Sequence, residues 1–535
     1  MSFRLLVAFC SLFCGSVALS QEVDLNELPR PEFRGLTQKQ LSRFIFSNEE
    51  SMIRRLRSLR PVTETYVQSL GHHQRQGLDN ALDEEFDFVM DDLYLLARVD
   101  FGENGPEEKL LIGAGSWRDW RNRYIEINNG TLEKIQPLGM LWMFFVDFDS
   151  FDADTYSLTY RGKQTLLHTE CLVFSVTPVK ERDSGRFRGE IWVDSSSFNI
   201  VRAKGVFAGP YERWFKALKG EERYFHFDTW RERNEEGWWQ PSATYFDERK
   251  AHPGRNLEFH YRGYGLFWQQ PENPACARDA VRGAQPNSSA VANSSGSSFT
   301  KSLVARLEAD GLLAIPAEQE RRLSGIVRQI APASIIAGHR IECRVLLTTP
   351  VEIFSVGDTI FVSRGLLNLI PNDSVLAFLL GRQVAHIVLG HTVKVPQTFP
   401  VSLFDLEEKR GFEGLGIHLQ PAEEAEADSK AIALLKESPY KDTVAETRSF
   451  LSELKSESRR FPNLVRARFG TGIFPEGSSF AGQKVAGTTP RKELQFANRY
   501  GVSWNCLIVD RQRDDTTAEV RTVDEPRVIQ APVVK

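Results

Sequence analysis

The sequence predicts an α+β protein of two folded domains, and three observations carry this prediction. Between Pro61 and Gln269, runs of aromatic and β-branched residues alternate with polar ones, as in an antiparallel sheet with one solvated face. A stretch rich in Pro, Ser, Asn and Gly then interrupts this pattern. Beyond it, helical periodicity mixes with short apolar strands, which indicates a mainly helical second domain with a small sheet.

Composition and charge limit the classes of function. The chain has 535 residues, of which 41% are hydrophobic and 26% charged, so it contains enough apolar material for folded cores. Its formal net charge is −5, and no basic stripe stands out. Both observations argue against a general nucleic-acid-binding protein.

The first twenty residues have the pattern of a secretory signal peptide. Arg4 precedes an apolar run, and Ala18 and Ser20 are the small residues expected before a cut at Gln21. A membrane anchor is the alternative, but the apolar run is short for a span. We therefore expect an exported protein, periplasmic or secreted, with no transmembrane span after cleavage.

One helix and a series of strands are predicted before residue 270. Thr37 and Gln40 form a capping-box pattern ahead of an apolar helical face, and Pro61 ends the helix. Six aromatic and β-branched segments follow as strands: "VTETYVQ", "YRGKQTLLHTECLVFSVTPV", "FRGEIWVDSSSFNIVRAKGVF", "RYFHFDTWRE", "GWWQPSATYFDE" and "LEFHYRGYGLFW".

These patterns divide the chain into five parts: a signal peptide at 1–20, an antiparallel β domain at 21–270, a flexible linker at 271–299, a second domain at 300–470 and an irregular extension at 471–535. After removal of the signal, four isolated cysteines remain: Cys171, Cys276, Cys343 and Cys506. Export permits disulfides among them, but three pairings exist and buried free thiols are an equal alternative.

The segment "LLGRQVAHIVLGHT", from Leu379 to Thr392, lies on a predicted helix that is apolar nearly all round. Arg382 and His386 are four residues apart and share one face, with Gln383 beside them. These are the positions of the two metal-binding histidines and the general base in an H-E-x-x-H helix. A core histidine with a nearby arginine whose stem is buried is the simpler interpretation of this helix alone.

The segment "EEAEAD" adds a second candidate group. Pro421 is suited to open a helix, and Glu424 and Asp428 lie one turn apart on one face of it. Taken alone, this is the pattern of a solvated acidic helix start.

Together, "DTIFVSRGLLNLI", "AHIVLGH" and "EAEADSKAIALL" resemble the zinc metallopeptidase family of the HtpX protease and the CAAX-prenyl endopeptidase. The resemblance covers about Leu303 to Lys436 and implies a gluzincin-like fold. It implies that His386 and Glu424 stand at metal-ligand positions, that Asp428 supports the site, and that His391 matches a histidine common after the second ligand.

Two departures from this family fall on the catalytic positions. Arg382 replaces the first histidine ligand, and Gln383 replaces the general base. A guanidinium cannot ligate zinc, and it would repel the ion by roughly 8 kcal/mol at 4 Å and an effective dielectric of 20. We therefore expect no cofactor, an Arg382 guanidinium held by Glu424, and a pseudopeptidase that binds peptide or partner segments. An active zinc endopeptidase with an altered site is the alternative.

The segment "FRGEIWVDSSSFNIVRAKG" resembles the hairpins of outer-membrane lipoprotein carriers, in which a curved half-barrel sheet wraps a helix. The resemblance implies binding of lipid or lipoprotein, with Trp192, Phe198, Ile200 and Val206 as candidate cavity walls. An ordinary aromatic core is the competing interpretation. A lipid carrier with a C-terminal docking module is thus a further alternative for the whole chain.

Overall fold

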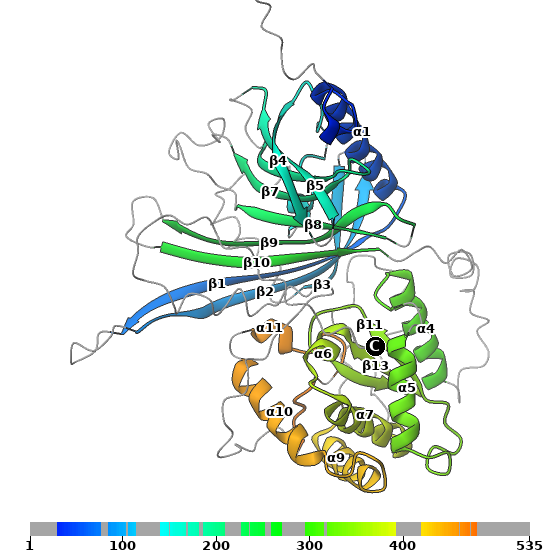
Figure 1. The fold of residues 1–535 in the computed structure, drawn as a ribbon. Helices are drawn as coiled ribbons and strands as arrows, with labels where there is room; N and C mark the ends of the chain where they lie inside the picture. The colour runs from blue at the N-terminus through cyan, green and yellow to red at the C-terminus, as the bar shows by residue number, and fades with distance from the viewer. Residues whose placement is uncertain are drawn as a thin grey trace, which may run out of the picture.

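The structure is a computed structural model (Figure 1). It consists of two parts that pack together: a large β-sheet with a helix, and a mainly helical part that begins at α4 (Ser295–Ala309). The described residues are 29–75, 84–102, 105–113, 140–148, 150–166, 169–180, 186–208, 226–234, 236–251, 258–269, 295–314, 318–391, 419–458, 461–470 and 472–478.

A ten-stranded antiparallel sheet forms the first part, in the order β3-β2-β1-β10-β9-β8-β7-β6-β5-β4. The sheet is open, since β3 and β4 are its two end strands. Its strands are β1 (Val62–Arg75), β2 (Glu84–Gly102), β3 (Gly105–Gly113), β4 (Tyr156–Leu166), β5 (Thr169–Pro178), β6 (Arg186–Asp194), β7 (Ile200–Ala208), β8 (Phe227–Arg233), β9 (Trp239–Ala251) and β10 (Glu258–Trp268). The six predicted strand segments are confirmed, while β2 and β3 were not predicted individually.

One face of this sheet is covered by helix α1 (Gln38–Arg57) and by the segment around the short helix η3 (Leu141–Phe144). The predicted capping box is present: the Thr37 hydroxyl accepts from the Gln40 backbone N–H, and the Thr37 N–H donates to the Gln40 side chain. Leu41 and Ile45 of α1 are fully buried against strands β4 to β7. The short helix η2 (Pro31–Phe33) precedes α1.

The other face of β1, β2 and β10 packs against the second part of the chain (Figure 1). Tyr66, Tyr94 and Trp268 on this face join one apolar cluster with Leu313 and Phe354 of the second part. The expectation of one solvated face is therefore wrong for these strands, because a second layer removes that face from water. The two parts share a core across the sheet.

The second part surrounds a three-stranded sheet in the order β11-β13-β12, where β11 is parallel and β12 antiparallel to β13. It confirms the predicted mixture of helices with a small sheet. Its elements are α4 (Ser295–Ala309), α5 (Glu318–Ile330), β11 (Glu342–Leu346), β12 (Ile353–Val356), β13 (Thr359–Ser363), α6 (Arg364–Leu369), α7 (Asp373–Val388), α9 (Pro421–Lys436), α10 (Val444–Glu457) and α11 (Pro462–Val465).

Several sequence predictions meet the limits of the described residues. The signal-peptide segment 1–20 and most of the predicted linker lie outside them, and α4 begins at Ser295, inside the range given to the linker. Residues 472–478 are described within the predicted extension, and Ile473 is buried at 1% exposure. Among the described helices, none is long and apolar enough to cross a membrane.

Candidate functional site

Helix α7 carries the first half of the candidate site. Asn372 caps it, because its side chain accepts hydrogen bonds from the backbone N–H groups of Ser374 and Val375. Every residue from Val375 to Ile387 is buried, as the nearly all-round apolar pattern predicts. Arg382, Gln383 and His386 are only 1–3% exposed, so they are polar groups inside a core.

Helix α9 carries the second half. Pro421 occupies the first turn, and Gln420 and Glu423 form a reciprocal capping box at its start. Glu424 and Asp428 are each 1% exposed, so the interpretation of this segment as a solvated acidic start is wrong for both carboxylates. Helices α7 and α9 pack together with the small side chain of Ala431 near Gly381.

Arg382 and His386 of α7 each lie next to one carboxylate of α9. Arg382 Nη1 lies 3.9 Å from Asp428 Oδ1, and His386 Nε2 lies 3.3 Å from Glu424 Oε2. The partner of the later residue on α7 is thus the earlier residue on α9, because the two helices run antiparallel. The expectation that Glu424 holds the guanidinium is wrong, because this register places Asp428 beside Arg382 and Glu424 one turn away beside His386.

His391 extends the group at the end of α7. Its Nδ1 lies 3.0 Å from His386 Nδ1, so one of the two rings donates a proton and the other accepts it. Its Nε2 lies 3.3 Å from Glu426 Oε2, an exposed carboxylate. The structure thus places His391 next to His386.

Ser478 is a site residue that the sequence did not reveal. Its hydroxyl donates to Asp428 Oδ2 at 2.7 Å, from a segment predicted to be irregular. Gly477 adopts a φ of +91° and lies against α9, where a Cβ would fall 2.1 Å from the Pro421 carbonyl oxygen. The only sequence signal for this arrangement is the turn-forming Pro475-Glu476-Gly477.

The residues at this site do not fit a catalytic zinc ion. Two donors at usual zinc bond lengths would stand roughly 3.3 Å apart in tetrahedral geometry, so the spacing of His386 and Glu424 alone is compatible with a metal. The position that the resemblance gives to the first histidine ligand, however, is Arg382, whose guanidinium cannot ligate a metal. Within the described residues, no group of three or more His, Cys, Asp or Glu side chains could hold a metal ion. Arg382 Nε and Nη1 also lack a hydrogen-bond partner there, so the cation is incompletely satisfied.

The four candidate lipid-wall residues do not line one face of the sheet. Ile200 belongs to the α1-side core, and Phe198 packs against that core. Trp192 belongs to a separate cluster on the opposite face, where its indole N–H donates to Gln164 Oε1 at 2.7 Å. Val206 alternates with Ala203 and Phe207 of the α1-side core and therefore points away from it.

On the α1-side face, aromatic side chains of the described residues pack against one another. Phe46 packs edge-on against Phe151 with ring centroids 4.9 Å apart, and Phe207 stacks on Phe227 at 5.3 Å. Trp142 lies 5.2 Å from Phe207. This arrangement is that of a packed core, the competing interpretation of the aromatic strand pattern.

A buried polar junction joins the two parts and was not predicted. The Glu64 carboxylate of β1 is 0% exposed; Oε1 accepts from Tyr94 Oη and the Thr349 N–H, both at 2.7 Å. Oε2 accepts from Thr349 Oγ1 at 2.8 Å and lies 3.4 Å from Arg364 Nη2. Burial raises the pKa of Glu64, while Arg364 and these hydrogen bonds oppose the rise.

Further contacts at the junction connect the same two surfaces. Asp92 of β2 accepts from the backbone and side-chain N–H groups of Asn463, each at 2.7 Å. The Trp268 indole N–H donates to the Gly311 carbonyl at 3.1 Å, and Arg98 forms an ion pair with Asp310 at 3.2 Å. No local sequence pattern announces such pairs, since their members lie far apart in the chain.

The cysteines give a partial answer on disulfides. Cys171 and Cys343 are buried free thiols, and burial raises the pKa of each to about 12. Cys276 and Cys506 lie outside the described residues.

No protein-family model matches the chain, and a search of the curated proteins finds no match. Solved structures similar to part of it include a DUF1329 family protein from Desulfovibrio piger. That protein is 11% identical, with 43% of this chain and 90% of that protein covered, and the TM-score is 0.20.

Two other similar structures belong to different proteins. The complex of MucA and MucB from Pseudomonas aeruginosa is 10% identical over 44% of this chain and 100% of that one, with a TM-score of 0.17. An outer-membrane lipoprotein-sorting domain from Vibrio parahaemolyticus is 6% identical over 45% of this chain and 99% of that one, with a TM-score of 0.19. These scores are too low to support an inference about fold or function.

Proposed function

We propose that this chain is an exported binding protein without peptidase chemistry, whose second part keeps the helix pair of a zinc metallopeptidase but not its zinc. The observation that carries the proposal is the buried Arg382 beside Asp428, with His386 turned to Glu424. In this role the second part recognises peptide or partner segments.

Charge compensation supports this assignment. Arginine stays protonated in proteins, so the site holds a permanent cation between two helices. Asp428 is the nearest carboxylate to that cation, and Ser478 orients Asp428 from the other side. Arg382, paired with Asp428 inside the core, therefore occupies the position where a zinc ion would need a neutral histidine.

Gln383 removes the second requirement of the peptidase reaction. Its amide does not accept a proton near neutral pH, so it cannot activate water as the glutamate of H-E-x-x-H does. Gln383 is 3% exposed and thus sits in the core rather than at a solvent-facing edge. The alternative of an active zinc endopeptidase needs both positions to be bypassed.

The lipid-carrier alternative has less support. It requires an apolar cavity beneath the curved sheet, whereas the described α1-side face is packed with aromatic rings. The four candidate wall residues also divide between the two faces of the sheet.

Metal analysis of the purified chain, together with proteolysis of an unfolded protein, tests the proposal. We expect far less than one zinc per chain and no cleavage that a chelator suppresses. The double variant Arg382→His, Gln383→Glu serves as the comparison, because it restores the two missing groups. Stoichiometric zinc and chelator-sensitive cleavage by the unaltered chain would overturn the proposal.

A further inference from the structure

The solvent-facing side of α1 and its flanks carries an unusual concentration of positive charge. Residues 30–60 contain eight Arg and Lys against three Glu, an excess of five positive charges in a chain whose net charge is −5. Seven of these cations are exposed, namely Arg34, Lys39, Arg43, Arg54, Arg55, Arg57 and Arg60. Figure 1 shows α1 at the periphery of the molecule, with one side on the sheet and the other free.

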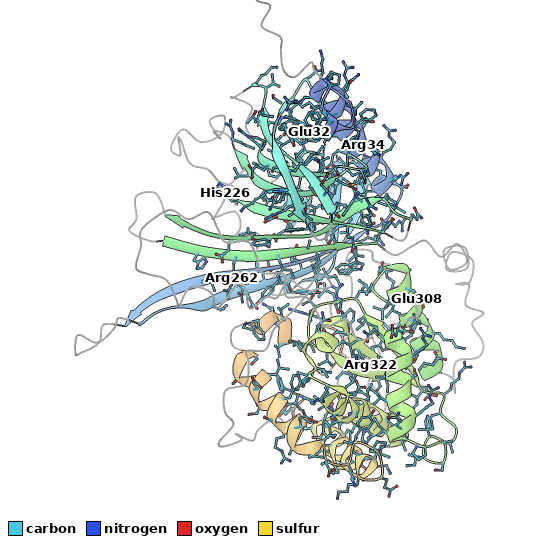
Figure 2. All side chains as sticks on the ribbon, in the orientation of Figure 1. Glu32, Arg34, His226, Arg262, Glu308 and Arg322 are labelled. Atoms are coloured by element: carbon cyan, nitrogen blue, oxygen red, sulfur yellow. The ribbon has the colours of Figure 1, made fainter. Side chains whose placement is uncertain are left out.

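The three acids of this segment neutralise little of the charge. Glu49 is 2% exposed and faces inward, where both its oxygens accept from Arg231. Glu50 is bound to Arg54 by an i,i+4 ion pair of 2.5 Å. Glu32 lies before the N-terminus of α1, next to Arg34 (Figure 2) and away from the cations of the helix itself. Among the described residues, Lys39 and Arg43 form no ion pair.

An exposed aromatic side chain accompanies these cations. Phe44 is 49% exposed, and among the described residues Val179 is the one other large hydrophobic side chain that is exposed. The Phe44 ring lies 6.0 Å from the ring of Phe198 in the hairpin between β6 and β7. Farther along α1, the Arg55 guanidinium lies 5.6 Å from the ring centre of the half-buried Trp238.

The hairpin is held so that the half-buried Phe198 ring packs on the core and borders Phe44. Phe198 has a φ of +57°, which is costly for a residue with a bulky side chain. The Asn48 side-chain amide donates to the carbonyls of Ser197 and Phe198, both at 3.0 Å, and so fixes the hairpin to α1. Asp194 fixes its other side by accepting from the Ser196 N–H at 2.8 Å.

We propose that this surface of α1 with Phe44 and Phe198 docks on an anionic lipid bilayer. Long basic side chains on the exposed side of a helix, with aromatic rings at one edge of that side, fit a planar, negatively charged interface, because the flexible cations reach its headgroups while the rings enter the headgroup region. An acidic protein partner is the less favoured occupant, since the cations follow a convex helix rather than a groove. This proposal is independent of the proposed function of α7 and α9.

Vesicle co-sedimentation of the purified chain tests the proposal. We expect binding to vesicles that contain phosphatidylcholine and phosphatidylglycerol, and little binding to vesicles of phosphatidylcholine alone. The bound protein should be released when the salt concentration is raised from about 0.1 to about 0.5 M. The triple variant Lys39→Glu, Arg43→Glu, Arg57→Glu should bind at least tenfold more weakly, because each basic side chain near such a surface contributes about fivefold. Phe44→Ser should weaken binding severalfold and keep the salt dependence.

A matched control changes the same amount of charge elsewhere. The variant Arg321→Glu, Lys436→Glu, Lys441→Glu alters three exposed cations of the second part and should bind within twofold of the unaltered chain. All variants share one N-terminus, so any contribution of residues 1–20 cancels, and thermal unfolding confirms that each is folded. Equal loss in the two triple variants, absence of binding to anionic vesicles, or binding to soluble polyglutamate in preference to vesicles would overturn the proposal.

Discussion

Replacing Glu64 by alanine should destabilise the whole molecule, because this one carboxylate joins the sheet to the second part. The change leaves three buried donors without their acceptor: the Tyr94 hydroxyl and the N–H and hydroxyl of Thr349. It also removes the carboxylate nearest to the Arg364 guanidinium at the junction.

The magnitude follows from these contacts. A buried donor that loses its partner costs about 1–3 kcal/mol, and removal of one member of a buried charged pair costs about 3–5 kcal/mol. The contributions overlap, since they share one carboxylate, so we expect a loss of about 3–5 kcal/mol in the free energy of unfolding. Glu50→Ala, at an exposed i,i+4 ion pair, should cost less than about 0.5 kcal/mol and is the control.

Urea unfolding followed by two signals measures both the stability and the coupling. Apart from Trp504, every tryptophan precedes residue 300, so fluorescence reports mainly on the sheet. Far-ultraviolet circular dichroism reports mainly on the helices, and most of the described helices lie in the second part. In the unaltered chain the two transitions should coincide, and in Glu64→Ala both should move to lower urea. Separate transitions in the unaltered chain, or a loss below about 1 kcal/mol, would refute the reasoning.

Three other predictions address single residues. Glu108 is buried with its Oε1 accepting from Thr63, and burial raises its pKa to about 8, so its contribution to stability is present below about pH 4.5 and lost as pH rises through 8. The unfolding free energy of Glu108→Gln, relative to that of the unaltered chain, should therefore rise by about 5 kcal/mol between pH 4 and pH 9 in urea titrations. A difference that does not change with pH would contradict this. Arg382→Ala should lower the unfolding free energy by about 3–5 kcal/mol, because it strands Asp428 inside the core; a loss under 1 kcal/mol would show that the pair is not buried in solution. Gly365→Ala should lower the melting temperature sharply, since its Cβ would fall 1.7 Å from the carbonyl oxygen of Thr349; an unchanged melting temperature would argue against this close approach.

Local patterns predicted those elements whose determinants lie close together in the chain. The Thr37–Gln40 capping box located the start of α1 to the residue, whereas the helix ends at Arg57, before the Pro61 that was expected to end it. In contrast, β2 was not predicted as a strand, because its acidic residues are depleted in strands in general. Asp92 is accommodated there through Asn463, 371 positions later, and no window of sequence contains both residues.

The candidate site divides in the same way. Spacing of four residues correctly placed Arg382 with His386 on one helix face and Glu424 with Asp428 on another. Which cation meets which carboxylate depends on the antiparallel packing of α7 and α9, a tertiary feature that periodicity does not encode. Ser478 reaches the site from a segment with no periodic pattern, so only the folded chain reveals it.

The common core on the far side of β1, β2 and β10 has a consequence for the continuity of the backbone. Because apolar side chains and buried polar pairs join the sheet to the second part, their association does not depend on the peptide that connects Gln269 to Ser295. A chain nicked once in that stretch should run as a single particle in gel filtration under native conditions. Its two fragments would come apart only in denaturant.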